Sequence, residues 1–164
     1  MIRRIAVLAF VFTLAVSFGF AQTGTPAPVQ NLYAAGASWN GAASPSVAGS
    51  ALYAHLLTDG TYAFTHVDAV PASVKPFTVT TNIGAGVAQK VASLGKYNVY
   101  VPAAAGVSFN GANTGWEWNT GAAIAIPIGT KGYSLVPTLR FLRSNVSGGA
   151  GVQPIIGLLV GWGK

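Results

Sequence analysis

The sequence contains no cysteine and very few charged residues, and both absences restrict what the protein can be. Without cysteine the chain forms no disulfide, no thiolate zinc site, no cysteine nucleophile and no lipid anchor on an N-terminal cysteine. Charged residues make up 7% of the chain, whereas a soluble domain typically carries about 25%. A water-facing surface would therefore be difficult to cover. Aromatic and β-branched residues are plentiful, which argues against disorder.

Long apolar runs and clusters of basic residues are also missing. After the first 21 residues, no stretch approaches the roughly 18 uninterrupted apolar residues of a transmembrane helix, so a helical membrane protein is excluded. The formal net charge is +6, of which two units come from Arg3 and Arg4. The remaining basic residues are scattered singly. A nucleic-acid partner would require a basic stripe, so none is expected.

Residues 1–21 have the three parts of a secretory signal peptide. Arg3 and Arg4 precede an apolar run that ends at Phe20, and Gly19 and Ala21 place small residues before the expected cleavage site. The apolar run is shorter than the roughly 20 residues that a membrane-spanning helix needs, which disfavours an N-terminal anchor. We therefore expect cleavage after Ala21, a flexible lead-in over residues 22–30, and one domain over residues 31–164.

From residue 31 onward the apolar pattern repeats every second residue, which is the period of a β-strand. In residues 116–128, for example, Trp116, Trp118, Ile124, Ile126 and Ile128 alternate with small or polar residues. The 21 glycines of the chain further oppose helix. Each predicted strand meets the roughly 9–11 residues that a tilted strand needs to cross a membrane. The eight predicted strands are 31–39, 47–57, 61–69, 77–91, 97–108, 116–128, 133–142 and 152–162.

The connections between these strands are expected to alternate in length. Residues 58–60, 93–96 and 129–132 form tight, glycine-containing turns, whereas 40–46, 70–76, 109–115 and 143–150 are longer. Short periplasmic turns and longer outer loops are typical of an even-stranded outer-membrane barrel. The sequence therefore predicts an all-β fold, an eight-stranded antiparallel up-and-down transmembrane β-barrel.

The sizes of the two faces indicate which one meets lipid. An eight-stranded barrel leaves an interior just wide enough for side chains to fill. Small and polar residues suit that lumen, and the large apolar residues suit acyl chains. Aromatic residues gather near strand ends, where they are expected to form the girdles of such barrels. The girdle candidates are Tyr33, Trp39, Tyr97, Phe109, Trp116, Trp118, Tyr133, Phe141 and Trp162.

Four prolines fall inside the predicted strands, at positions 102, 127, 137 and 154. A closed barrel has no edge strand, so each proline removes a ladder hydrogen bond. We expect bulges or early strand ends at these positions.

This pattern resembles the small eight-stranded outer-membrane proteins of the OmpX and OmpA-barrel type. The last strand shares their alternation of apolar residues through Ile156, Leu158, Val160 and Trp162, although Gly163 and Lys164 follow the aromatic residue. The resemblance implies export, escort by periplasmic chaperones, insertion by the barrel-assembly machinery and residence in the lipid of a bacterial outer membrane. It implies no single activity and no cofactor.

Few polar side chains are candidates for chemistry. Glu117 and Arg140 are expected to face the lumen on neighbouring strands, where an ion pair would satisfy both charges. His66 and Asp68 share a face and could act with a loop serine in a nucleophilic set, but polar girdle positions fit them better. Any chain rich in serine offers such sets of serine, histidine and aspartate. His55 and His66 lack carboxylate spacing for a metal, so no metal site and no catalytic residue are assigned. The serines considered are Ser44, Ser46 and Ser73.

A structural or surface-interaction barrel that is not an enzyme is the leading hypothesis for function. Three alternatives remain open: a narrow conduit for small solutes, a lipid-acting enzyme of the outer leaflet, and a soluble lipocalin-like barrel. The hypothesis of a lipid-acting enzyme predicts that replacing His66 abolishes activity without unfolding the barrel. The soluble barrel predicts that Ile124, Ile126, Leu139 and Phe141 lie inside.

Overall fold

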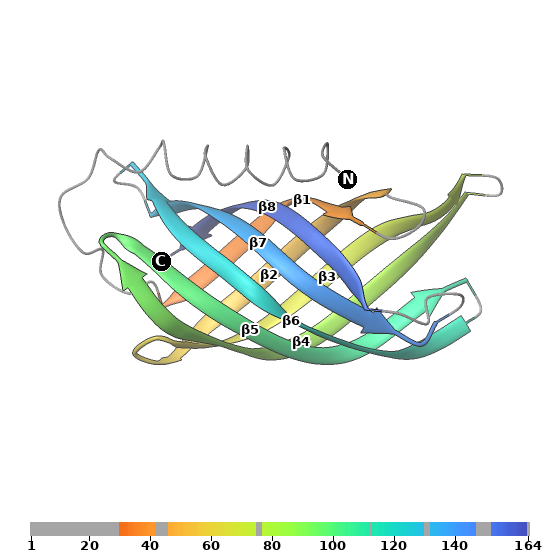
Figure 1. Cartoon of the computed structure of the whole chain (residues 1–164), viewed down its shortest axis with the longest axis horizontal. Coiled ribbons are helices and arrows are strands. Elements are labelled where there is room, and N and C mark those ends of the chain that lie inside the picture. The colour runs from red at the N-terminus through yellow and green to blue at the C-terminus, as the bar shows by residue number, and fades with distance from the viewer. Residues whose placement is uncertain are drawn as a thin grey trace.

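The computed structural model is a single closed β-barrel (Figure 1). It describes residues 30–41, 46–74, 77–111, 113–129, 132–146 and 152–163. The predicted signal peptide, and all of the predicted lead-in except Gln30, lie outside these residues. In the described part of the chain, no helix has the length and apolar character needed to cross a membrane.

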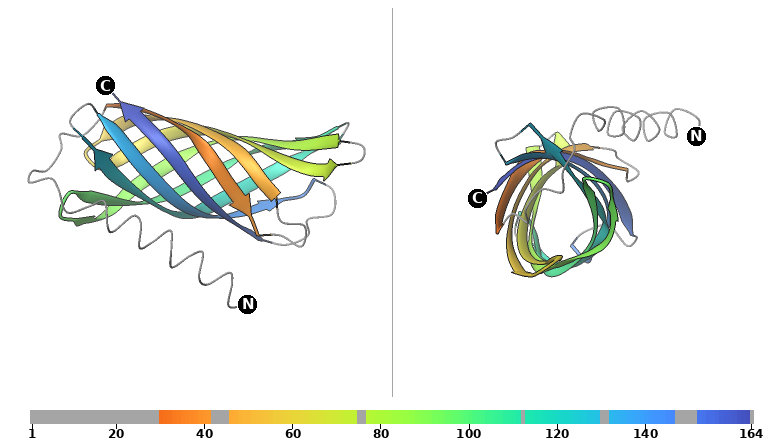
Figure 2. Two further views of the ribbon diagram at one scale, coloured as in Figure 1. Left: turned by 90° about the horizontal axis from the view of Figure 1, so that it is seen from above. Right: turned by 90° about the vertical axis from the view of Figure 1, so that its left-hand side faces the viewer.

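Eight antiparallel strands follow one another around the barrel in sequence order, and β1 pairs with β8 to close it (Figure 2). The predicted number of strands and the up-and-down order are confirmed. The strands are β1 (Asn31–Asn40), β2 (Ser46–Thr58), β3 (Thr61–Val74), β4 (Phe77–Leu94), β5 (Tyr97–Asn110), β6 (Asn113–Ile128), β7 (Tyr133–Ser144) and β8 (Gln153–Gly163).

The two ends of the barrel differ in their connections. The end of the barrel where β1 begins, β8 ends and the three tight turns lie is called the inner end. The opposite end is called the outer end. Gly60 and Gly95 have φ of 81° and 63°, a backbone conformation that glycine adopts without steric cost. Two of the four connections predicted to be long are in fact short. Strands β3 and β4 are separated by two residues, as are β5 and β6, because pairing continues far beyond the predicted strand ends.

Two of the four in-strand prolines, Pro102 and Pro137, interrupt a ladder without ending the strand. At Pro102, the pairing of β5 with β6 lapses between Tyr100 and Ala103, and the register before the gap is the same as the register after it. Pairing of β6 with β7 lapses in the same way at Pro137. The expectation of bulges or early strand ends was therefore wrong at Pro102 and Pro137, whereas Pro127 and Pro154 each lie one residue from a strand end. The Thr120 hydroxyl donates a 3.0 Å hydrogen bond to the Pro102 carbonyl, which supplies a partner within the gap.

The buried charged and amide side chains face the lumen, and many large apolar side chains face outward, as predicted for a membrane barrel. Asn82 is 1% exposed, and the Arg140 guanidinium reaches into the lumen, whereas Phe141 is 42% exposed. Ile126 is only 3% exposed, although its register partner Leu135 places it on the outer face. The arrangement of Asn82, Arg140 and Phe141 contradicts the soluble lipocalin-like alternative.

The lumen is divided into an apolar inner half and a polar outer half. Tyr62, Phe64, Ala54 and Ala104 form the centre of the inner half, which we call the apolar plug. Partly buried residues packed against them are Leu32, Leu52, Leu56, Ala88 and Tyr100. The alternation of residue sizes predicted a lumen of small and polar groups throughout, and the apolar plug corrects that expectation. On β3 the bulky residues share the inward face with His66 and Asp68, because side chains alternate strictly along a strand.

Candidate functional site

The polar half of the lumen is built around one bidentate ion pair. The Arg140 guanidinium, on β7, donates hydrogen bonds of 2.9 and 2.7 Å to the two carboxylate oxygens of Asp68, on β3. The Ser50 hydroxyl donates a third bond, of 2.6 Å, to Asp68 Oδ1, and Ser50 itself lies 2.7 Å from the Ser38 hydroxyl. Strands β1, β2, β3 and β7 are thereby joined across the lumen.

A second group of side chains surrounds His66. Its Nε2 atom lies 2.9 Å from Glu117 Oε1 and 3.2 Å from Asn119 Nδ2, and Asp68 Oδ2 is 3.8 Å away. His66, Glu117 and Asn119 are each 2% exposed. Buried charge is costly unless it is paired, so these contacts hold β3 and β6 in place across the lumen. His66 Nδ1, Glu117 Oε2 and Asn119 Oδ1 are buried without a protein hydrogen-bond partner.

Glycine makes room for the histidine cluster. A Cβ atom added at Gly84 would lie 2.9 Å from Glu117 Oε1 and would also overlap the His66 ring. Gly84 is the register partner of His66 on the neighbouring strand β4. The glycine is therefore needed because the imidazole and the carboxylate occupy the space over its backbone.

Nearer the outer end, uncharged side chains complete the network. The Ser108 hydroxyl donates a 2.6 Å bond to Asn82 Oδ1, and Ser144 donates a 2.9 Å bond to Ser108. Asn145 Oδ1 accepts a 2.7 Å bond from the Trp116 backbone N–H, so the segment after β7 is tied to the start of β6. The polar half is thus a dense hydrogen-bonded network that spans the barrel.

The structure corrects the predicted pairing of Glu117 with Arg140. Both side chains point into the lumen, as expected, but Arg140 pairs with Asp68 and Glu117 contacts His66. The register explains the difference, because Arg140 lies opposite Gly121 and Glu117 lies opposite Ser144, four residues farther toward the outer end. The two groups are on neighbouring strands at different heights.

His66 and Asp68 are not girdle residues, since both are buried in the lumen. Among the loop serines proposed to act with them, Ser44 lies outside the described residues, and the side chains of Ser46 and Ser73 are not described. His55 lies 2.8 Å from Asn31 Oδ1 on the exposed inner end, far along β2 from the lumen cluster. Among the described residues, no three His, Asp and Glu side chains are placed to hold a metal ion.

The nine girdle candidates all lie on the outward face. Tyr33 and Tyr53 have ring centroids 5.0 Å apart, and Tyr33 stacks on Trp162 at 6.2 Å. The inner end carries Tyr33, Tyr97, Tyr133 and Trp162, and the outer half carries Trp39, Phe109, Trp116, Trp118 and Phe141. The Arg143 guanidinium lies 6.0 Å over the ring of Trp116. The roles of these rings at lipid headgroups remain a prediction.

Sequence reasoning did not identify the partners of the two charged groups. Asp68 and Glu117 are two of only three acidic residues in the chain, and this scarcity was a signal that each serves a buried cation or imidazole. The contributions of Ser38, Ser50 and Ser108 carried no such signal, because their pairing depends on strand register.

No protein-family model and no curated protein matches this chain. Several solved structures resemble it, including the two that follow. Neisserial surface protein A has a TM-score of 0.64 at 8% identity, over 82% of this chain and 96% of that chain. The Yersinia pestis outer membrane protein Ail, in a phospholipid bilayer nanodisc, has a TM-score of 0.53 at 9% identity, over 82% and 99%. At these identities the likeness concerns the fold alone, which is that of the small eight-stranded outer-membrane β-barrels.

Proposed function

We propose that this chain, which has the fold of the small eight-stranded outer-membrane barrels, resides in a bacterial outer membrane as a structural or surface-interaction protein. Its outward face supports this location, because it carries large apolar residues such as Val67, Ile83, Val101 and Leu158 that water would not favour. Outer-membrane lipid is then its permanent partner. Export and barrel assembly would follow the route expected from the predicted signal peptide.

The apolar plug is the observation that separates this role from that of a conduit. Tyr62 and Phe64 are 8% and 6% exposed, and the Tyr62 ring meets Tyr100 edge-on at 5.7 Å across the lumen. Leu52 and Leu56 pack against the same cluster from β2. Above the plug, the Arg140–Asp68 pair bridges β7 and β3. A hydrated path for small solutes would have to displace both layers.

A surface role also agrees with the geometry of the outer end. Two hairpins, β3–β4 and β5–β6, continue as paired strands to their tips and hold them on a rigid wall. Both structural neighbours reported above are named as surface or outer-membrane proteins. A barrel that fixes its outer hairpins in this way presents them to other molecules, with no need for a catalytic group.

Cell fractionation and electrical recording test the proposal. The full chain is expected in the outer-membrane fraction of a Gram-negative host, and purified barrel in planar bilayers is expected to leave the conductance at the lipid baseline. A soluble periplasmic protein would contradict the location. Regular conductance steps, absent from a heat-unfolded control, would contradict the closed lumen and favour the conduit.

A further inference from the structure

The wall of this barrel is much shorter on one side than on the other. Strands β7, β8, β1 and β2 have 12, 11, 10 and 13 residues, whereas β3, β4, β5 and β6, on the opposite side, have 14, 18, 14 and 16. In Figure 2 the β3–β4 hairpin extends well past the outer end of β1. We call the β7–β8–β1–β2 side the short side.

The outward-facing aromatic residues follow the same gradient. On β1, Tyr33 and Trp39 are six residues apart; on β7, Tyr133 and Phe141 are eight apart; on β5, Tyr97 and Phe109 are twelve apart. The separation therefore doubles between β1 and β5 and is intermediate on β7. Strand length and ring position are independent observations, and both give the short side the smaller height.

These separations convert into membrane heights. With a rise of about 3.3 Å per residue and a strand tilt of about 40°, the ring-to-ring height is about 15 Å on β1, about 20 Å on β7 and about 30 Å on β5. The apolar band of an outer-membrane barrel is about 25 Å tall. Only the β5 side matches a bilayer of ordinary thickness, and the β1 side falls short by about 10 Å.

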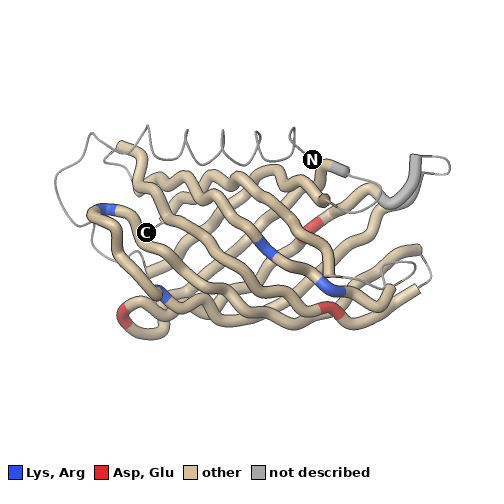
Figure 3. Tube along the Cα trace, viewed as in Figure 1, with Lys and Arg blue, Asp and Glu red and all other residues tan. Residues whose placement is uncertain are grey.

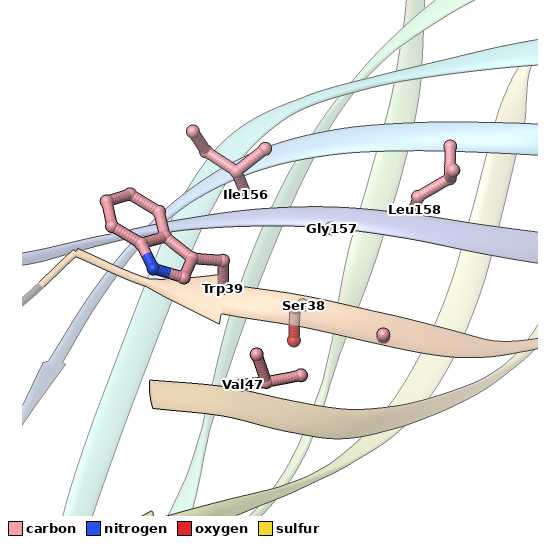
Figure 4. Close-up of a pocket in the computed structure, with 7 residues that line it drawn as sticks. Ser38, Trp39, Val47, Ile156, Gly157 and Leu158 are labelled. Atoms are coloured by element: carbon pink, nitrogen blue, oxygen red, sulfur yellow. The ribbon is translucent and has the colours of Figure 1, made fainter. Parts of the chain in front are cut away.

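The short side also carries an apolar hollow on its outward surface. Trp39, Val47, Ile156 and Leu158 border it, and the small side chain of Ala37 leaves its space open (Figure 4). Its volume is about 240 Å³. It lies beside Trp39, at the upper limit of the short apolar band. A hollow beside Trp39 offers packing space to lipid acyl chains whose ends lie at a different depth in the membrane from those of neighbouring lipids.

We propose that the short side of the barrel locally thins the bilayer, so that lipid headgroups follow the rings of Tyr33 and Trp39 inward. The inference rests on the proposed residence in a membrane. A bilayer adapts to a short apolar surface by thinning, since leaving amphipathic rings in hydrocarbon is unfavourable. Among the described residues, β8, β1 and β2 carry no Lys, Arg, Asp or Glu on either face (Figure 3), but the outward faces of β3 to β6 carry none either, so the proposal rests on strand length and ring position.

Single-cysteine spin labels test this proposal directly, because the chain has no cysteine of its own. Ala37→Cys places a label between Tyr33 and Trp39 on β1, and Ala103→Cys places one midway between Tyr97 and Phe109 on β5. Both positions face outward and are exposed. The full chain would be folded into vesicles of dilauroyl-, dimyristoyl- or dioleoylphosphatidylcholine, and label depth read from accessibility to oxygen against a water-soluble nickel complex.

Thinning predicts that the label at position 37 stays shallow in all three lipids, with several-fold more contact with the nickel complex than the label at 103. The depth at 103 should increase with chain length. Replacing both Tyr33 and Trp39 with leucine should move the label at 37 deeper, whereas Phe109→Leu, as the matched control, should not.

Equal depths at the two positions, or a depth at 37 that increases in parallel with chain length, would overturn the inference while leaving the membrane location intact. Failure of the unlabelled chain to fold into any of the vesicles would instead contradict the proposed function.

Discussion

At the scale of single residues, the barrel buries two of the three acidic side chains of the chain. Asp68 and Glu117 are buried in the lumen, where Asp68 pairs with the Arg140 guanidinium and Glu117 contacts the His66 imidazole, each from another strand. A buried pair adds little net stability compared with an apolar pair, but removing one partner leaves a charge that nothing compensates. The lumen residues therefore act as a register lock, by which we mean that any strand arrangement separating the paired side chains is destabilised by an uncompensated buried charge.

Replacing Arg140 with methionine should lower the free energy of unfolding by about 3–5 kcal/mol, because Asp68 stays buried without its cation. Urea titration of the barrel in detergent micelles or vesicles would measure it. Arg143→Met is the matched control; Arg143 faces outward over Trp116, and its loss should cost no more than about 1 kcal/mol. Adding Asp68→Leu to the Arg140 variant should restore much of the loss. Equal effects of the two arginine variants would contradict the register lock.

Gly84→Ala should destabilise the barrel by about 1–3 kcal/mol, the usual cost of overpacking a filled interior. The added methyl group would force apart the His66 ring and Glu117. Gly49→Ala serves as control, since a Cβ there meets nothing within 4 Å. The same urea titration compares the two, and similar midpoints would show that the histidine cluster tolerates displacement.

At the scale of elements, β5 continues through Pro102, where the neighbouring Thr120 hydroxyl supplies a hydrogen bond within the gap. The β5–β6 ladder loses its pairing around Pro102 and resumes in the same register. Bulges occur elsewhere, between Leu56 and Thr58 in the β2–β3 ladder and near Pro71 and Lys90 in the next two ladders. An up-and-down barrel fixes each strand from both sides, so one missing bond is not enough to end it.

Thr120→Val should cost about 0.5–1.5 kcal/mol, the net contribution of one hydrogen bond. The substitution keeps the branched shape and removes only the hydroxyl that bonds the Pro102 carbonyl. Thr65→Val, at an exposed outward position on β3, controls for the change in strand propensity. If both variants unfold at the same urea concentration, the hydroxyl does not support the gap.

At the scale of the whole molecule, closure between β1 and β8 makes the barrel one cooperative unit. The closing ladder runs from Leu32 and Gly163 at the inner end to Asn40 and Ile155 at the outer end. Every strand therefore has two neighbours, and no edge is left to pair with other chains. The slanted wall and the divided lumen are likewise properties of the closed barrel and of no single strand.

The unboiled protein in dodecyl sulfate should migrate faster on a gel than the boiled protein, because the closed barrel stays compact until heat opens it. A chain shortened before Gln153 lacks β8 and the closing ladder, so it should migrate alike in both conditions. Identical migration of the full chain with and without boiling would contradict a stable closed barrel.

Much of the fold was predictable from local pattern. Alternation along residues 116–128 and 133–142 fixed the inward and outward faces, because a strand side chain has only two directions. The same reasoning placed Arg140 and Glu117 in the lumen. It failed on β3, where the assumption that bulky residues face lipid conflicts with the inward positions of Tyr62 and Phe64.

The sequence by itself determined the number of strands, their order and the faces of most residues, since these follow from periodicity and composition within short segments. Only the tertiary structure decided that Arg140 meets Asp68 rather than Glu117, that the inner lumen is filled, and that one wall is short. Those outcomes depend on strand register and stagger, which are set by all eight ladders closing together. No segment contains that information alone, because a shift of two residues in one ladder preserves every face and changes every partner.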